Sequence, residues 1–580
     1  MDSKNAKFIF RKFYLPKLEK IGNLLGTFSL TEKVIFWFFA FVLFGSTFLM
    51  LKEINKNFFA EVPKSGGEII EGLIGSPRFI NPLLAISNTD RDLTALVYSG
   101  LLKATPDGKV VPDLAEHYEI SEDGLIYTVT LKEDASFHDG VAVTTEDIAY
   151  TVRMSLDNIV KSPKRPNWEG VGVKIIDQKQ IQFILKTPYS PFTENLTLGI
   201  LPKHIWEKVE PEQFAFSQLN IEPIGSGPYR IISTKMNSSG IMEKYELKPF
   251  TKYALGEPYI SKIIIRFYPN EETLINAYKK GYVEDINTIS PEQALELEKN
   301  GSRIENVPLP RIFGIFFNQN QNAVFTNSEV RKALNKAVDR ERIVREVLSG
   351  FGTPIYGPVP TTSQYFNKDI EGEFNPQEAI ELLESNGWEI NEETKIREKT
   401  IKKVSTTLEF EIATSDAPEL KAAANIVKEN WESVGAKVTV KIFEIGDLNQ
   451  NIIRPREYDA LLFGEIIGRD MDLFAFWHSS QRNDPGLNIA SYANANSDKL
   501  LEQVRSSRDE EDRIEKFFKF QENIESDMPA IFIYSPDFIY ITSNKIKGIN
   551  LGQITLPSER FFGVHSWFIE TENIWKIFSR

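Results

Sequence analysis

Asp470 and Asp472 are the carboxylates whose spacing most resembles a chemical site in this sequence. Two acidic side chains two residues apart can face one side of a strand, and paired carboxylates act as acid and base in glycoside hydrolysis. At exposed turns, however, such pairs are usually solvated or cap a helix. We therefore do not interpret this pair as catalytic, and we predict no catalytic residue in the chain.

The residues that bind metals and redox cofactors are sparse. No two of the five histidines lie closer than 21 residues apart, so no helix or hairpin carries a pair of ligands. Cysteine is absent, which excludes disulfides, thiolate catalysis, cysteine zinc sites and iron–sulfur clusters. A metal site would have to be assembled by folding from distant residues. We expect no metal and no cofactor.

Sequence motifs for nucleotide binding or hydrolysis are also missing. The chain has no Walker A sequence, no His-Glu-x-x-His and no Gly-x-Ser-x-Gly. Gly225-Ser226-Gly227 resembles a phosphate loop, but Pro228 lacks an N–H and Tyr229 is bulky, so the segment is better interpreted as a turn. An enzyme is therefore disfavoured.

Charge is distributed unevenly along the chain. The net charge is −14, yet residues 1–33 hold seven Lys and Arg against three Asp and Glu. The acidic remainder shows no basic stripe, which argues against nucleic acid as a partner. Aromatic residues make up 12% of the sequence, and some of them are expected to line a pocket.

An apolar segment near the N-terminus predicts a membrane anchor. Residues 34–51 run without a charge for eighteen residues, about 27 Å as a helix, which matches the hydrocarbon thickness. The basic residues 1–33 before it predict a cytoplasmic N-terminus and an extracytoplasmic body. A cleaved signal peptide is the alternative, but no Ala-x-Ala site follows. We favour an uncleaved anchor followed by a stalk, residues 52–65.

From residue 66 the sequence alternates helix and strand signals, as in α/β proteins. Thr89–Leu102 begins with Thr-x-x-Asp and has apolar residues at helical spacing, while residues 124–142 alternate as a strand and turn before a second cap at Thr144. Gly435 is predicted to end a helix that leads into the strand 437–444.

Ordered segments along the body carry a family resemblance. They include Asn81-Pro82-Leu83, Thr94–Leu102, Ser121–Leu131, Ser136–Asp147, Gly225–Tyr229, Phe313–Asn320, Val330–Arg340, Tyr458-Asp459-Ala460, Asp470–Ser480 and Gly486–Tyr492. In this order they resemble family 5 extracellular solute-binding proteins, the peptide, dipeptide and nickel receptors of ABC importers. The resemblance covers nearly all of residues 66–560.

The resemblance implies an α/β, two-lobed periplasmic-binding-protein-like (type II) fold with an extra small domain, here preceded by one N-terminal transmembrane helix. The implied division is lobe I at 66–88, 222–312 and 541–580, the extra domain at 89–221, and lobe II at 313–540. A ligand would be buried between the lobes by hinge closure.

The implied function is capture of an oligopeptide or peptide-like solute for ABC permease subunits, by a monomer held at the cell membrane. Peptide-binding members carry Trp-x-x-Asp, whose Asp binds the ligand amine, whereas this chain has Gly464 and Ile467 at those positions. Glu465 is the nearest carboxylate, followed by Asp470 and Asp472. By segment position, the predicted ligand-contacting residues are Asn318, Asn320, Glu465, Asp470, Trp477, His478, Asn488 and Tyr492.

Other interpretations stay open. Asn318 could cap a turn, Asp470 could orient a loop, and His478 could be a surface histidine. The missing amine-binding Asp motivates a receptor for a nickel chelate or an oligosaccharide instead. A surface scaffold or chaperone-like module on the same fold is a third possibility.

Overall fold

The computed structural model describes residues 26–401 and 403–576, which fall into two compact units. Of the described residues, 26–64 with 570–576 form one unit, and 65–401 with 403–569 form the other.

The smaller unit contains one long helix and a two-stranded ribbon. Helix α2 (Leu30–Phe58) includes the predicted span, and its segment Leu30–Glu53 is long and apolar enough to cross a membrane. Strand β1 (Phe59–Lys64) pairs antiparallel with the C-terminal β23 (Glu570–Trp575), so that the Trp575 ring lies 4.9 Å from that of Phe59. The predicted stalk is therefore divided between the end of α2 and β1.

A twelve-stranded sheet runs through the larger unit. Its main path is β20-β19-β21-β14-β22-β12-β2-β11-β10-β9, and β13 and β15 also pair with β22. The strands are β2 (Glu68–Ile74), β9 (Tyr229–Met236), β10 (Met242–Pro249), β11 (Lys262–Tyr268), β12 (Asp285–Asn287), β13 (Arg303–Pro308), β14 (Arg311–Phe317), β15 (Gly352–Pro354), β19 (Glu409–Ser415), β20 (Lys437–Phe443), β21 (Ala460–Ile466) and β22 (Ala530–Thr542).

Strand β22 belongs to both lobes. Its first half pairs with β14, and its second half pairs with β13, from Pro308↔Asp537 onward. The change of pairing partner lies at 308–311 on the β13–β14 side and near 535–537 in β22, while the predicted lobe boundaries at 312 and 540 stay predictions. Two strand connections side by side are suited to act as a hinge.

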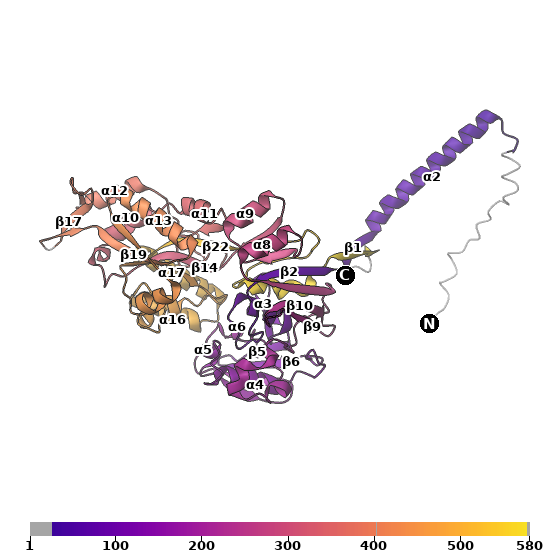
Figure 1. The fold of residues 1–580 in the computed structure, drawn as a ribbon, viewed down its shortest axis with the longest axis horizontal. Helices are drawn as coiled ribbons and strands as arrows, with labels where there is room; N and C mark the ends of the chain where they lie inside the picture. Colours follow the sequence, from indigo (N-terminus) through magenta and orange to yellow (C-terminus); the bar gives the residue numbers. More distant parts are fainter. Residues whose placement is uncertain (1–25, 402, 577–580) are drawn as a thin grey trace. The chain divides into compact units, whose positions relative to one another are not determined.

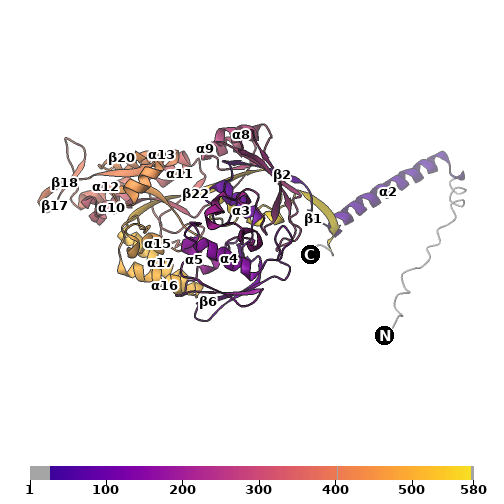
Figure 2. The ribbon, with the colours of Figure 1, turned by 60° about the horizontal axis from the view of Figure 1, so that its bottom comes forward.

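Both faces of the lobe II sheet are covered by helices. Successive residues of β22 alternate between them, since Ile531 and Ile533 pack in one core and Phe532 in the other. One face carries α10 (Ser328–Lys336), α11 (Arg340–Val347), α12 (Pro376–Ser385) and α13 (Pro418–Ser433), and the other carries α15 (Phe474–Trp477), α16 (Ala495–Ser506) and α17 (Glu510–Asp527), as Figures 1 and 2 show. As predicted, α13 ends before Gly435, whose φ of +92° favours glycine, and leads into β20.

Lobe I combines its sheet strands with α8 (Glu271–Lys279) and α9 (Pro291–Lys299) on one face, and with α3 (Asn88–Val97) and the 3-10 helix η6 (Pro557–Ser566) on the other. The helix predicted from Thr89 starts two residues earlier, at the cap Ser87, whose side chain accepts from the Asp90 N–H. Thr89 instead donates its hydroxyl to the Ile74 carbonyl, so the predicted Thr-x-x-Asp cap was wrong.

A fully buried charge cluster ties lobe I together. Arg560 donates to Asp92 and Glu71 at 2.8 Å each, and the Tyr540 hydroxyl donates to the second Glu71 oxygen at 2.7 Å. The side chains of Arg560 and Glu71 are 0% exposed. Because the four residues come from β2, α3, β22 and η6, the cluster fixes segments that are far apart in sequence.

The extra domain has its own four-stranded sheet and core. Strands β5 (Ala115–Ile120), β6 (Ile126–Leu131), β8 (Gln180–Ile184) and β7 (Gly172–Ile175) lie in that order, near α4 (Thr145–Leu156) in Figure 1. Thr144 and Asp147 form the capping box predicted for α4.

Short elements complete the larger unit. They are β3 (Leu102–Ala104), β4 (Val110–Pro112), β16 (Glu389–Ile390), β17 (Arg397–Ile401), β18 (Val404–Thr407), α5 (Arg165–Trp168), α6 (Phe192–Asn195), α7 (Lys203–Trp206) and α14 (Ile445–Asp447).

Candidate functional site

The loop that follows β21 lies where the lobes meet. Register pairs Ile466 at the end of β21 with Arg311 at the start of β14, and the Ile467 N–H donates to the Pro310 carbonyl at 2.9 Å. The next residues, Gly468–Asp472, therefore extend from lobe II beside the crossing strands. We call this segment the cleft loop.

Arg469 connects the cleft loop to both other parts of the unit. Its guanidinium donates to the Gln553 carbonyl at 2.7 Å and pairs with Glu559, both in lobe I. Its Nε lies 3.6 Å from Glu194 of the extra domain, and the side chain is 8% exposed. One buried cation thus links three regions, as expected of a closed cleft.

Two acids beside Arg469 have raised pKa values. Burial raises the pKa of Glu194 to about 7, although Arg469 opposes the shift. Burial and the charge of Asp472 raise the pKa of Asp470 to about 6. Asp472 has committed partners, because Arg505 binds it with two nitrogens and the Tyr189 hydroxyl of the extra domain donates to it at 3.2 Å. Asp470 forms no ion pair with the described residues, and it lines neither of the two cavities described next.

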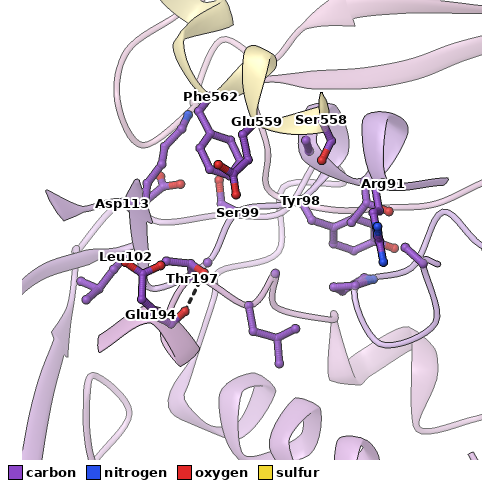
Figure 3. Close-up of a pocket in the computed structure, with 18 of the residues that line it drawn as sticks. Arg91, Tyr98, Ser99, Leu102, Asp113, Glu194, Thr197, Ser558, Glu559 and Phe562 are labelled. Atoms are coloured by element: carbon purple, nitrogen blue, oxygen red, sulfur yellow. Dashed lines mark hydrogen bonds between the residues drawn. The ribbon is translucent and has the colours of Figure 1, made fainter. Parts of the chain in front are cut away.

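Two cavities lie near the cleft loop, one lined by Glu194 and Glu559, the acidic partners of Arg469, and the other by Gly468, Arg469 and Met471 of the loop. One, of about 210 Å³, lies between α3, the extra domain and η6 (Figure 3). We call it the α3 cavity. The other, of about 230 Å³, lies between the lobes and is lined by Pro308, Pro310, Thr362, Tyr365, Arg469 and Gln553.

Polar side chains dominate the wall of the α3 cavity. The Tyr98 and Ser99 hydroxyls are buried without a hydrogen-bond partner among the residues that the structure describes. The Lys103 ammonium donates to the Tyr253 hydroxyl at 2.6 Å, and burial lowers the pKa of Lys103 to about 8. Burial also raises the pKa of Asp113, against the effect of Lys103. Such a cavity suits a polar solute better than an apolar one.

Glu465 is buried within lobe II, on β21 opposite Ile312. Neither carboxylate oxygen has a partner in the described parts of the chain, and burial raises the pKa of Glu465 well above its ordinary value. The side chain does not line either cavity. Its predicted ligand contact stays a prediction.

Four other predicted residues build one supporting cluster behind the cleft loop. Trp477 is fully buried, and the Asn488 amide donates to the carbonyls of Trp477, His478 and Tyr492. The Tyr492 hydroxyl donates to Asp527 at 2.7 Å. His478 stacks on Phe474, with ring centroids 4.0 Å apart. The structure brings these four together, but none of them lines the two cavities.

Asn318 and Asn320 lie at the opposite end of β14 from the lobe crossing. The Asn318 amide donates to the Arg456 carbonyl at 2.8 Å, and its side-chain oxygen accepts from the Asn320 N–H. This geometry matches the alternative that Asn318 organises a turn. Of the eight predicted residues, Asp470 is the one placed in the cleft loop.

No group of three metal-ligating side chains occurs among the described residues. His138 and His565 are each buried, which lowers the pKa of each to about 4. Both are neutral at physiological pH. His138 has its Nε2 3.0 Å from the Gly227 carbonyl, so it supports the Gly225-Ser226-Gly227 turn.

The sequence alone did not single out several residues of the site. Arg91, Lys103, Lys164, Glu194 and Arg469 carry no motif, and they come together only through folding. A charge in the middle of an apolar or aromatic stretch was the available signal for Lys103, which follows Leu101 and Leu102.

Comparisons with known proteins agree on this architecture. The sequence model of bacterial extracellular solute-binding proteins, family 5, matches residues 109–485. The oligopeptide-binding protein AppA of Bacillus subtilis is 27% identical over 518 residues, which cover 87% of this chain and 92% of AppA. The nickel-binding periplasmic protein of Escherichia coli is 29% identical over 408 residues, covering 66% of this chain and 72% of that protein.

Solved structures give the same picture. AppA of Bacillus subtilis in complex with a nonapeptide matches with a TM-score of 0.67 at 26% identity, covering 88% of this chain and all of that one. NikZ of Campylobacter jejuni in complex with Ni(L-His) matches with a TM-score of 0.66 at 26% identity, covering 87% and 100%. The predicted type II fold is thereby confirmed.

Proposed function

The chain belongs to the family 5 extracellular solute-binding proteins of ABC importers, and we propose that it captures oligopeptides or peptide-like solutes between its lobes and delivers them to an ABC permease. The observation that carries the proposal is the cleft loop, which Arg469 links to lobe I and to the extra domain, with one cavity lined by the loop and another lined by Glu194 and Glu559. Binding in such a cleft would couple capture to lobe closure.

Within the proposed cleft, Asp470 takes the place of the amine-binding Asp that the family pattern has at Ile467. It is partly buried and lies in the loop that bridges the lobes, and its pKa of about 6 lets a ligand ammonium draw it into the charged form. No group in the cavities is arranged as a nucleophile with a base, and we propose capture without chemistry.

We also propose that the intact N-terminal helix holds the receptor at the membrane, with the larger unit outside the cell. The span Leu30–Glu53 and the basic residues before it support this orientation. Intact-mass analysis of the native protein decides between anchor and signal peptide, because a cleaved chain would lack the N-terminal residues.

The test of peptide capture uses the full chain purified in detergent micelles. Native mass spectrometry is expected to show co-purified peptides, and peptides of three to nine residues are expected to raise the melting temperature. Asp470→Asn should weaken peptide binding, whereas Asp416→Asn, in lobe II outside the cleft loop, should not. Absence of both co-purification and stabilisation would overturn the proposal.

A nickel chelate is the second candidate, favoured by the relative that is named for nickel binding and by the structure with Ni(L-His). Competition separates the two candidates. If Ni–histidine or an oligosaccharide displaced bound peptide at lower concentration than other peptides did, the non-peptide assignment would replace the first. If no compound of any class bound, a scaffold role on this fold would be favoured.

A further inference from the structure

The ribbon of β1 and β23 has an apolar end and an acidic end. Beside α2, the register pairs Phe59 with Trp575 and Ala60 with Ile574. The next four pairs contain three glutamates, which are Glu61, Glu572 and Glu570. The side chains of the ribbon therefore change from apolar to acidic along its length, and the apolar end is the one joined to α2.

Aromatic rings at the apolar end of the ribbon face solvent. Trp575 is 50% exposed and Phe58, the last residue of α2, is 53% exposed. The Trp575 ring centroid lies 6.3 Å from that of Phe58 and 4.9 Å from that of Phe59, so the three rings form one cluster. Exposed apolar clusters mark surfaces that contact another protein or a membrane.

This cluster follows directly on the apolar span. Phe58 lies seven residues after Leu51, the last residue of the uncharged run, which is about 10 Å of helix rise. The headgroup layer on each side of the hydrocarbon is about 5–7 Å thick. Helix side chains lean toward the helix N-terminus, which for α2 is the direction of the proposed bilayer, and the usual helix tilt lowers Phe58 further. The Phe58 ring is therefore within reach of the headgroup layer.

Strand β23 runs back toward the same layer. Figure 1 shows β1 continuing from the end of α2, and β23 is antiparallel to β1, so the residues from Glu570 to Trp575 approach the end of α2 in order. Lys576 follows Trp575. An indole has an apolar ring and one N–H donor, and a lysine has an apolar stem and a charged tip, so both side chains are suited to a membrane–water interface.

The acidic end of the ribbon lies away from this layer. Glu570 is paired in register with Lys64, about 17 Å along the strands from Trp575. Lipid phosphates repel carboxylates, so a bilayer favours contact with the apolar end alone. A protein partner would not need its contact to be confined to the end nearest the span. The distribution of side chains thus favours lipid as the partner of the aromatic cluster.

We propose that Phe58, Phe59, Trp575 and Lys576 form an interfacial anchor, which lies in the extracytoplasmic headgroup layer of the membrane that α2 spans. This inference rests on the proposed membrane anchoring by α2. It adds a second lipid contact, made by a strand from the other end of the sequence. The partner is a phospholipid surface, and the contact holds β23 as well as α2 at the bilayer.

The test measures depth in the bilayer along the ribbon. Because the chain has no cysteine, each single-cysteine variant carries one nitroxide label. The full chain is placed in phosphatidylcholine nanodiscs, and electron paramagnetic resonance measures how often the label collides with oxygen, which concentrates in lipid, and with chromium oxalate, which stays in water. The ratio of the two collision rates is expected to be about threefold or more higher for Lys576→Cys than for Glu570→Cys.

A label at Phe41, in the middle of the span, tests the membrane anchoring by itself. If Phe41→Cys collided with the two reagents as it would in water, the anchoring by α2 would fail, and the interfacial anchor with it. If Phe41→Cys lay in lipid while Lys576→Cys behaved like Glu570→Cys, the interfacial anchor alone would fail. A label at Lys576 that is shielded from both reagents would show that protein, such as a second copy of the chain, covers the cluster, and this also would overturn the lipid contact.

Variants connect the depth of the label to the aromatic ring. In the Lys576→Cys protein, Trp575→Ser is expected to lower the collision ratio to that of Glu570→Cys, whereas Trp575→Tyr, which keeps an aromatic ring with a polar atom, should retain the high ratio. Asn573→Ser changes an exposed polar side chain of the same strand and should also retain it. An unchanged ratio in Trp575→Ser would overturn the role of the indole as an anchor.

Discussion

Two neighbours on α3 serve opposite purposes. Asp92 points into the core of lobe I, where Arg560 binds it with two nitrogens at 2.8 Å. Arg91 reaches the α3 cavity, where no acid of the described chain pairs with it. Successive helix residues are about 100° apart, so one helix can present one charge to the core and the next to the cleft.

The difference between the two side chains is whether an opposite charge within the protein pairs with them. In the Arg560 cluster every charge has a partner, and the carboxylates raise the pKa of Arg560 even though burial alone would lower it. At the α3 cavity, burial and the charge of Arg91 lower the pKa of Lys164. A buried charge with a partner holds segments of the chain together, whereas a charge without a partner can pair with an incoming ligand.

The largest effect is expected from the paired cluster. Arg560→Met leaves Glu71 and Asp92 buried without their cation, and removal of one partner of a buried pair costs about 3–5 kcal/mol. Urea unfolding of the full chain in micelles measures the loss. Lys279→Met, whose pair with Glu296 is about half exposed, should cost at most about 1 kcal/mol. Equal losses in both variants would remove the distinction between buried and surface pairs.

The next effect concerns the bridge between the lobes. Arg469→Ala removes charged hydrogen bonds worth about 1.5–3 kcal/mol, so peptide affinity should fall about tenfold or more. Spin labels on lobe I and lobe II should report a larger separation. Arg456→Ala, which removes an arginine that donates to carbonyls within lobe II, should leave that separation unchanged. A variant with unchanged affinity and separation would contradict the role of Arg469 in closure.

A smaller effect is expected from the near-neutral acid. The folded pKa of Glu194, about 7, lies above its unfolded value, so its contribution to stability is present at low pH and is lost as pH rises toward 7 and beyond. Glu194→Gln imitates the neutral form. The melting temperatures of the two proteins should agree at pH 5, and the unmodified protein should be the less stable at pH 8.

The difference between proteins is the quantity to measure, because the buried His138 and His565 give the opposite trend. Their lowered pKa values remove stability as pH falls from about 6.5 to 4, and they do so in both proteins. Glu169→Gln, which changes an exposed acid of the extra domain, is the control. Its melting temperature should differ from that of the unmodified protein by the same amount at pH 5 and at pH 8. A constant difference between pH 5 and 8 would refute the role of Glu194.

The smallest change in stability, with the opposite sign, is expected from Arg91 at the α3 cavity. Arg91→Gln removes a desolvated charge without breaking a pair, so the free energy of unfolding without ligand should stay unchanged or rise by up to about 1 kcal/mol. The exposed Lys161→Gln should change it by less than about 0.5 kcal/mol. A loss as large as that of Arg560→Met would show that Arg91 is structural.

Local signals in the sequence predicted local structure well. The Thr144 capping box and the Gly435 helix end were predicted because their partners lie within a few residues. The Thr89 cap failed because a tertiary contact, the Ile74 carbonyl, takes its hydroxyl. The overall architecture was accessible through the ordered family segments.

The site was harder to predict, for a physical reason. Asp470 was predicted because it lies in a segment with a family pattern. Arg469 and Arg91 were not, because a lone arginine in a sequence does not reveal whether an acid will meet it after folding. Trp477 and Asn488 were predicted to contact ligand from their segment, yet they hold the neighbouring loop through Asn488 hydrogen bonds.

The ribbon of β1 and β23 gives the chain a second attachment to its own N-terminal helix. Lys64 and Glu570 are register partners, so the 65–569 segment begins and ends at adjacent strands. A protease that cut the backbone just after Lys64 would leave the released fragment held through six paired residues of β23. In the proposed membrane-anchored form, release of the 65–569 segment therefore requires the ribbon to open as well as the peptide bond to break.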